Sequence, residues 1–207
     1  MQFPHGAALF PDITLGILAG GRATRLGGID KAWMLCDGLP LVLRLCDAFD
    51  ERVARILISA NRDLPRYTQC ELHTVPDRFT DAGPLAGIEA LLAACETEWL
   101  LTVPVDVLSL PPDLIERMVA GGQGAFAEDD DGFQPLIASW SVAKTRIAVE
   151  EALATRALAV HELQTRLEMQ PTRFHNFSFG NLNTPDDLVA AGITPESSRP
   201  PSREFHG

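Results

Sequence analysis

A glycine-rich segment with three cationic side chains follows directly on an apolar run near the N-terminus. Residues 18–31 read LAGGRATRLGGIDK, in which Arg22, Arg25 and Lys31 supply positive charge. Glycine permits positive φ and a close approach to a ligand, and turned backbone N–H groups can form a concave anion site. The glycines concerned are Gly20, Gly21, Gly27 and Gly28. The segment predicts a phosphate-holding loop, although it matches neither the GxxxxGK[ST] nor the GxGxxG motif.

An aspartate at the end of another apolar run is the second candidate for phosphate chemistry. Asp106 lies in LLTVPVDVLSLP, just past a predicted buried strand. Mg²⁺ prefers one or two carboxylates together with phosphate oxygens and water, so Asp106 could hold this metal. Lys31 and the forked guanidinium of Arg25 could neutralise charge on a departing pyrophosphate. A turn or helix-capping role is the alternative for Asp106.

Two further polar residues follow predicted strands. Asn61 lies in SANRD and Asp77 in VPDRF. Asn and Asp at such positions are usually turn formers, so the residue types alone do not separate a binding role from a turn. The segment 83–87, GPLAG, then opens a helix whose N-terminus could accept an anion or simply pack closely on a strand.

The order of predicted elements brings these residues to one edge of a sheet. Apolar segments alternate with helical patterns, which is typical of a mostly parallel sheet covered on both faces. Strands are predicted at 13–18, 55–60, 71–75 and 99–103, and helices at 40–49, from 84, and at 112–120. Ligands bind outside the carboxyl ends of the strands in such sheets. The loops after these four strands should therefore converge on one rim.

The second half of the chain predicts an antiparallel excursion at one edge of the sheet. Strands at 125–126 and 136–140 flank the polar turn EDDDGF. Helices at 143–155 and 160–169, a strand near 173–177, and a helix from Pro185 capped by Asn183 and Thr184 complete the pattern. We therefore expect a Rossmann-like three-layer α/β/α fold.

Length and composition favour one globular domain. The chain has 207 residues, of which 46% are hydrophobic and 22% charged. We expect residues 1–192 to form the domain and 193–207, rich in Ser, Pro and charge, to be a disordered tail. The formal charge of −11 argues against a nucleic-acid surface, which needs excess Lys and Arg.

The cysteines and the N-terminus bear on metal sites and location. Cys36, Cys46, Cys70 and Cys95 show no C-x-x-C spacing, so a zinc site is not expected and they read as reduced thiols. Neither an export signal nor an apolar run long enough for a membrane span is visible. We expect a cytoplasmic protein without membrane contacts.

The glycine-rich string resembles the signature of the molybdenum cofactor guanylyltransferases, which reads LAGG, a short spacer, R-M-G-G, one residue and D-K. Leu26 stands where that family usually has Met. Further matches are A-N-R at 60–62, GPLAG at 83–87 and NLNTPDDL at 181–188, so the resemblance extends from about residue 13 to 189. The family's P-C-D-T-P segment is altered here: its Cys and Thr positions are Val105 and Val107, and its second Pro is Leu108.

The resemblance implies a nucleotidyltransferase that joins GTP and Mo-molybdopterin into the guanine dinucleotide cofactor and releases pyrophosphate. It implies Mg²⁺ on Asp106, catalytic roles for Arg25, Lys31 and Asp106, and a second-substrate or metal-proximal role for Asn181 and Asn183. It also implies transient contacts with other proteins of molybdenum cofactor biosynthesis. The nucleotide-binding residues that it implies are Leu18, Ala19, Gly20, Gly21, Lys31, Asn61, Asp77 and Asp106.

Two alternatives remain open at the level of the sequence. Cytidylyltransferases of related type commonly read LAAG, whereas this chain has Ala19, Gly20 and Gly21, and the extra glycine favours the guanine branch. A noncatalytic nucleotide-binding protein of the same fold is the other alternative, suggested by the altered surroundings of Asp106.

Overall fold

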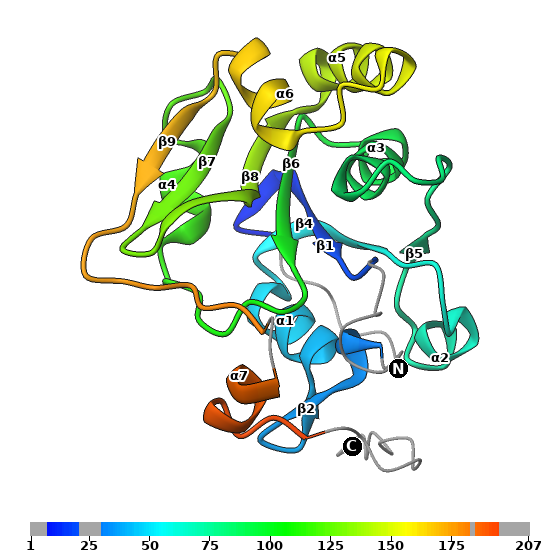
Figure 1. The fold of residues 1–207 in the computed structure, drawn as a ribbon, viewed down its shortest axis with the longest axis vertical. Coiled ribbons are helices and arrows are strands. Elements are labelled where there is room, and N and C mark those ends of the chain that lie inside the picture. The colour runs from blue at the N-terminus through cyan, green and yellow to red at the C-terminus, as the bar shows by residue number, and fades with distance from the viewer. Residues whose placement is uncertain (1–7, 21–29, 183–184, 195–207) are drawn as a thin grey trace.

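The computed structural model describes residues 8–20, 30–182 and 185–194, and a seven-stranded sheet forms its centre (Figure 1). Strands β1, β4, β5 and β6 pair in parallel, whereas β8 is antiparallel to both β6 and β7, and β9 is parallel to β7. The predicted mostly parallel sheet with an antiparallel part is confirmed. In spatial order the strands are β5 (Thr74–Val75), β4 (Val53–Ser59), β1 (Phe10–Leu18), β6 (Trp99–Pro104), β8 (Gly132–Ser141), β7 (Ala125–Asp129) and β9 (Gln170–Arg173).

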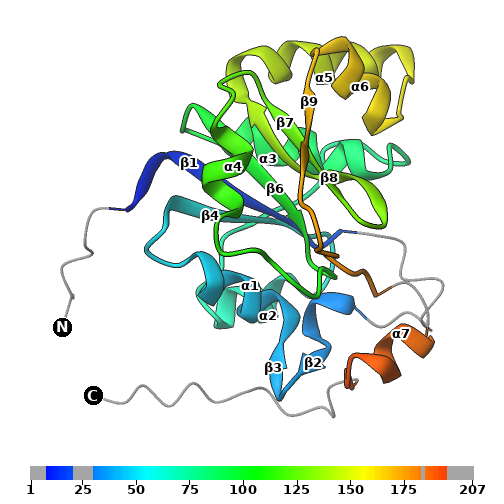
Figure 2. The ribbon, with the colours of Figure 1, turned by 90° about the vertical axis from the view of Figure 1, so that its left-hand side faces the viewer.

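Helices cover both faces of this sheet, which makes the three predicted layers. One core cluster joins the sheet to α1 (Leu41–Phe49), α2 (Leu64–Gln69) and α4 (Leu114–Val119). A second cluster on the opposite face joins it to α3 (Pro84–Ala94), α5 (Val142–Thr155) and α6 (Val160–Arg166). Figure 2, turned by 90° from Figure 1, shows α5 and α6 above the central strands and α1 and α2 below them. The short helix α2 was not predicted.

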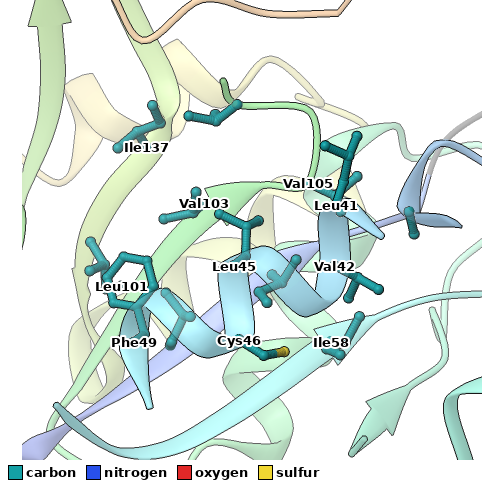
Figure 3. Packing of buried hydrophobic residues seen from close by; sticks show 14 of the residues in the cluster. Leu41, Val42, Leu45, Cys46, Phe49, Ile58, Leu101, Val103, Val105 and Ile137 are labelled. Carbon is teal, nitrogen blue, oxygen red and sulfur yellow. The ribbon is translucent and has the colours of Figure 1, made fainter. Parts of the chain in front are cut away.

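The predicted apolar face of the first helix is confirmed. Leu41, Leu45 and Phe49 recur at a spacing of four residues, so they lie on one face of α1, and each is buried. Figure 3 shows them packed among residues of the central strands, including Leu101 and Val103 of β6. This packing fixes α1 on one face of the sheet whose strand ends carry the polar residues.

Helix α3 packs closely on the sheet at Gly87. Pro84 occupies its first turn, where a missing N–H costs nothing, as predicted. A Cβ added at Gly87 would lie 2.7 Å from Ser59 Oγ and 3.1 Å from Leu18 Cδ2, so a side chain there requires a shift of its neighbours. The absence of a side chain at Gly87 therefore sets the distance of α3 from β1 and β4.

The antiparallel hairpin is longer than predicted. Strands β7 and β8 continue into the EDDDGF segment and leave Asp130 and Asp131 as the turn, because ladder bonds need only backbone groups. The strand predicted at 173–177 was wrong, since β9 is Gln170–Arg173. Beyond it Asn176 has a φ of +53°, and Phe174, Phe177 and Phe179 form an aromatic cluster where the strand was expected to continue.

The end of the described chain pairs with a small ribbon. Strands β2 (Leu35–Cys36) and β3 (Leu39–Pro40) form a two-stranded sheet, and α7 (Pro185–Ala190) begins where predicted. Thr194 and Leu35 exchange backbone hydrogen bonds of 2.9 and 3.0 Å, and Ile193 is buried. Ordered contacts thus continue two residues beyond the predicted domain end at 192, while the rest of the predicted tail lies outside the described residues. Within the described chain, none of the helices has the length and apolar character needed to span a membrane.

Candidate functional site

A cavity of about 1100 Å³ opens at the carboxyl ends of the parallel strands. Its lining comes from the ends of β1, β4 and β6, the loop after β5 and the first turn of α3. The loops that the sequence predicted to converge do so. The sequence-predicted site residues that line the cavity are Leu18, Ala19, Gly20, Lys31, Asn61, Asp77 and Asp106.

Lys31 and Asp106 form an ion pair at one side of this cavity. Lys31 Nζ lies 2.8 Å from Asp106 Oδ2 and also donates to the carbonyl oxygen of Leu182. Lys31 begins a single 3-10 turn, η2 (Lys31–Trp33), which Asp30 caps by accepting from the backbone N–H of Ala32 at 3.0 Å. The cap fixes the backbone from which the lysine reaches Asp106.

The altered residues beside Asp106 pack into the core. Val105, labelled in Figure 3, and Val107 are 4% and 1% exposed and belong to the hydrophobic cluster that includes α1. Asp106 between them lines the cavity, as does Val105. Apolar side chains at these two positions suit their buried surroundings. The departures from the family pattern therefore leave the carboxylate at the cavity.

The segment 179–182 runs alongside Asp106. Leu182 N donates to Asp106 O at 3.3 Å, and Asn181 forms an antiparallel bridge with Val107. The side chain of Asn181 donates to Gln134 Oε1 at 3.4 Å, and Gln134 in turn donates to the buried carboxylate of Asp129 at 3.1 Å. Asn181 thus directly precedes Leu182, whose carbonyl oxygen accepts from Lys31. Asn181 itself is not among the residues that line the cavity.

Asn61 and Asp77 are joined by a reciprocal pair of hydrogen bonds on another side of the cavity. Asn61 Nδ2 donates to Asp77 Oδ2 at 2.8 Å, and Asp77 N donates to Asn61 Oδ1 at 2.8 Å. Ser59, at the end of β4, donates to Asp77 Oδ1 at 3.0 Å. A carboxylate has about four acceptor positions, so Asp77 keeps capacity for a ligand donor.

Glycines line the cavity for two different reasons. Gly83 has a φ of +58° at the start of α3, a conformation that side chains rarely adopt. Gly20 is not among the positive-φ residues of the described chain, so of the two properties that glycine permits, positive φ and close approach, it does not use the first. A Cβ at Gly20 would lie 3.4 Å from Asn61 Nδ2, so its small size serves proximity to Asn61 rather than backbone conformation.

Asp30 occupies a partly buried position between the cavity and α2. Burial raises the pKa of its carboxyl above the ordinary value, and the hydrogen bond from Ala32 opposes that shift. Next to it, Trp33 and Tyr67 pack with ring centroids 4.8 Å apart, and Arg66 lies 3.9 Å over the Trp33 ring. This cluster supports the base of the lysine-bearing turn.

Several predicted site residues lie outside the described residues. They include two residues of the glycine-rich loop and one of the C-terminal asparagines, so their placement stays a prediction. These residues are Gly21, Arg25 and Asn183.

The structure also adds polar residues that sequence reasoning missed. Glu89 is 2% exposed on α3 and accepts from both Nε (3.2 Å) and Nη2 of Arg78. This hydrogen bond raises the pKa of Arg78 above its ordinary value. A sequence signal existed for Glu89, since it lies four residues after Leu85 on the face predicted to be buried. Ser59 carried a weaker signal as the last residue of an apolar strand.

The carboxylates at the cavity suit a metal ion that the protein and the phosphates of a bound substrate hold together. Among residues 8–20, 30–182 and 185–194, no group of three or more His, Cys, Asp or Glu side chains could hold a metal ion. Asp106 instead offers one hard carboxylate at the cavity, beside a lysine. Mg²⁺ commonly binds in this way, with substrate phosphates and water completing its coordination.

Comparison with known proteins identifies the family of the chain. Residues 15–166 match the MobA-like NTP transferase domain family. The chain is 36% identical to the molybdenum cofactor guanylyltransferase of Yersinia pseudotuberculosis serotype O:1b (strain IP 31758) over 184 residues, covering 86% of this chain and 93% of that protein. It is 35% identical to the enzyme of that name from Yersinia pestis (strain Pestoides F), with the same coverage.

Solved structures show the same fold at lower identity. Molybdopterin-guanine dinucleotide biosynthesis protein A from Archaeoglobus fulgidus superposes with a TM-score of 0.68 at 19% identity, over 86% of this chain and 96% of that one. The 2-C-methyl-D-erythritol 4-phosphate cytidylyltransferase from Thermus thermophilus gives 0.63 at 16% identity, over 85% and 95%. On the strength of the sequence matches, this nucleotidyltransferase chain belongs to the molybdenum cofactor guanylyltransferase family of MobA-like NTP transferases.

Proposed function

We propose that this protein transfers GMP from GTP to Mo-molybdopterin, forming the molybdopterin guanine dinucleotide cofactor and releasing pyrophosphate. Its family membership supports the reaction. The structural observation that carries the proposal is the Lys31–Asp106 pair, 2.8 Å apart at a cavity large enough for a nucleotide. The ammonium of Lys31 can bind a phosphate of the nucleotide, and the carboxylate of Asp106 can bind the metal ion that accompanies this phosphate.

In this reaction the terminal phosphate of molybdopterin attacks the α-phosphorus of GTP in line with the leaving pyrophosphate. No covalent enzyme intermediate is formed. Lys31 donates to phosphate oxygens as negative charge accumulates on the pyrophosphate, and Arg25 does the same from the loop. Catalysis is then mainly positioning and charge stabilisation.

The metal assigned to the site is Mg²⁺, held by Asp106 together with phosphate oxygens and water. When bound, it would act as a Lewis acid on the phosphoryl oxygens. Asp106 is suited to this role because its side chain is 19% exposed at the cavity and already faces a cation, Lys31. The carbonyl of Leu182 and the ion pair hold the lysine within reach of the same phosphates.

The nucleoside is assigned to the part of the cavity that is lined by Leu18, Ala19, Gly20, Asn61 and Asp77. Gly21 is assigned to the same role from its position in the sequence alone. Guanine offers ring N–H and amino donors, and the ribose offers hydroxyl donors. The carboxylate of Asp77 is oriented by Ser59 and Asn61 and retains acceptor capacity for either group.

The second substrate, Mo-molybdopterin, is assigned to the surface next to Asp106 that the segment with Asn181 contributes. Asn183 is assigned to the same role because it follows two residues later in the sequence. The bridge between Asn181 and Val107 supports this assignment, because it brings the segment next to the proposed metal ligand. We further propose a cytoplasmic enzyme that makes transient contacts with other proteins of molybdenum cofactor biosynthesis.

A thermal-shift comparison of GTP, CTP, ATP and UTP, each with and without Mg²⁺, tests nucleotide choice. A ligand that binds only the folded state stabilises it by about 2.7 kcal/mol at a concentration of 100 Kd. We expect the largest rise in Tm with GTP and Mg²⁺ together. A larger rise with CTP would favour a cytidylyltransferase, and binding of GTP without pyrophosphate release in the presence of molybdopterin would favour a noncatalytic protein.

A further inference from the structure

The loop between β5 and α3 directs successive residues to different surroundings. Asp77 and Phe79 line the cavity, whereas Arg78 between them pairs with Glu89 on α3. Asp77 is held by Ser59 and Asn61 from β4 and the residues that follow it. The two residues that precede Phe79 are therefore each fixed to a different element of the fold.

Phe79 differs from the other exposed apolar residues. In the described part of the chain, the exposed large hydrophobic side chains are Leu9, Phe79, Phe133, Ile147 and Val189. Of these five, Phe79 alone lines the cavity. Its side chain is 42% exposed, and none of the aromatic pairs found among the described residues includes it. A ring at this position offers an apolar planar surface to whatever occupies the cavity.

The ion pair between Arg78, the residue before Phe79, and Glu89 involves the one charged side chain that is buried on α3. Glu89 is nearly completely buried on a helix whose other buried side chains are apolar. Burying a carboxylate is costly unless a partner compensates it, and both of its oxygens accept from the Arg78 guanidinium. The two bonds hold Arg78 with the geometry of a fork, which fixes the backbone between Asp77 and Phe79.

We propose that Phe79 is the stacking surface for the nucleobase and that the Arg78–Glu89 pair is the positioning element that holds it at the cavity. The inference rests on the proposed function, since it takes a nucleoside triphosphate as the ligand. The observation that supports it is that Phe79, whose ring is in none of the aromatic pairs of the described residues, lines the cavity two residues after the hydrogen-bond acceptor Asp77. Asp77 accepts hydrogen bonds from the edge of the nucleoside, and Phe79 contacts the flat face of the base.

The experiment measures the Kd of GTP with Mg²⁺ by calorimetry for the full chain and its variants. Replacing a stacking aromatic by alanine weakens nucleobase binding by about 5- to 100-fold. We expect that loss for Phe79→Ala, a smaller loss for Phe79→Leu, and near wild-type affinity for Phe79→Trp. Phe133→Ala removes an exposed ring on β8 that does not line the cavity and should leave the Kd within twofold.

Two further measurements separate stacking from a general structural effect. Inorganic tripolyphosphate, which has no base, should bind the wild type and Phe79→Ala with the same Kd. In Phe79→Trp, GTP should quench tryptophan fluorescence more than it does in the wild type, which has Trp33, Trp99 and Trp140 as background. Equal losses of GTP and tripolyphosphate affinity, or no additional quenching, would overturn the stacking role.

The positioning role is tested with Arg78→Ala combined with Glu89→Gln, which avoids leaving a buried charge unpaired. We expect the Kd and KM for GTP to rise several-fold, with kcat and the Kd of tripolyphosphate little changed. Unchanged GTP affinity in this double variant would overturn the positioning role.

The outcomes distinguish this proposal from the proposed function. If the wild type binds GTP and releases pyrophosphate but Phe79→Ala binds GTP as tightly, the stacking proposal alone is wrong. If Phe79→Ala instead raises only the KM for molybdopterin, the ring contacts the second substrate and the nucleobase proposal is again overturned. A wild-type chain that fails to bind GTP would overturn both.

Discussion

Lys31 Nζ and Asp106 Oδ2 lie 2.8 Å apart although 75 positions separate the two residues in the chain. The lysine begins a single helical turn after the glycine-rich loop, and the aspartate follows the buried strand β6. Their side chains are only 26% and 19% exposed, so each charge has a partner in a setting where an unpaired charge would be costly. The ion pair brings together the cation and the carboxylate to which the proposed nucleotidyl transfer assigns the phosphates and the metal.

Asp106→Asn should remove most turnover while the fold survives. The change is nearly isosteric and still offers Lys31 an acceptor, but a neutral amide is a poorer ligand for Mg²⁺ than a carboxylate. We expect kcat to fall by about 100-fold or more, comparable with loss of one electrostatic contact in other active sites. Steady-state pyrophosphate release at saturating Mg²⁺ is the measurement, and activity within twofold of wild type would remove Asp106 from the metal-binding role.

Lys31→Gln should lower kcat by about 100-fold, because charge on the leaving pyrophosphate would lose its ammonium partner. The chain has one other lysine, Lys144 on α5, which provides a matched control. Lys144→Gln removes the same charge at a position that does not line the cavity, and it should retain full activity. Equal effects of the two substitutions would show that net charge, rather than the site, accounts for the loss.

Gly87→Ala should destabilise the protein through contact with β1 and β4. The new Cβ would lie 2.7 Å from Ser59 Oγ, and overpacking of this kind costs about 1–3 kcal/mol. For a chain of this length the expected fall in Tm is about 2–10 °C.

Gly121→Ala is the control for that substitution, since a Cβ there would have nothing within 4 Å and the residue is not among those with positive φ. Calorimetric Tm values for both variants make the comparison. The GTP Kd of Gly87→Ala should also rise, because Ser59 orients Asp77. An unchanged Tm would mean that α3 can move away from the sheet without cost.

Thr102→Val should lower stability without changing nucleotide affinity. Thr102 Oγ1 accepts from Trp140 Nε1 at 2.8 Å and donates to the carbonyl of Leu136 at 2.8 Å, and both Thr102 and Trp140 are fully buried. Valine keeps the shape but leaves the indole N–H unpaired, at a cost of about 1–3 kcal/mol. Thr102→Ser retains the hydroxyl and should unfold close to the wild-type midpoint in urea. Similar midpoints for Val and Ser would refute the role of the hydrogen bond.

The parallel half of the fold was predictable because its signals are local and strong. Leu41, Leu45 and Phe49 show the helical period that buries one face of α1, and Pro84 starts α3 where a proline is tolerated. The convergence of Asn61, Asp77 and Asp106 then follows from the rule that parallel strands present their carboxyl ends at one edge.

Features that depend on tertiary contacts could not be predicted in the same way. A strand was expected at 173–177, but the backbone is left-handed at Asn176, and the rings of Phe177 and Phe179 pack on each other. The Arg78–Glu89 pair joins a loop to a helix 11 residues later, so no local pattern specifies it. No local pattern specifies the role of Ser59 either, because this residue donates to the carboxylate of Asp77, which lies in the loop after β5.

The most direct test is a product assay with the purified full chain, Mg²⁺, Mo-molybdopterin and either GTP or CTP. We expect pyrophosphate release and formation of the guanine dinucleotide cofactor with a kcat/KM for GTP at least about 10-fold above that for CTP, equivalent to ~1.4 kcal/mol in transition-state binding. The Lys31→Gln variant should show the same preference at a much lower rate. A wild type that prefers CTP, or that binds GTP without releasing pyrophosphate, would contradict the assignment of this protein as a guanylyltransferase.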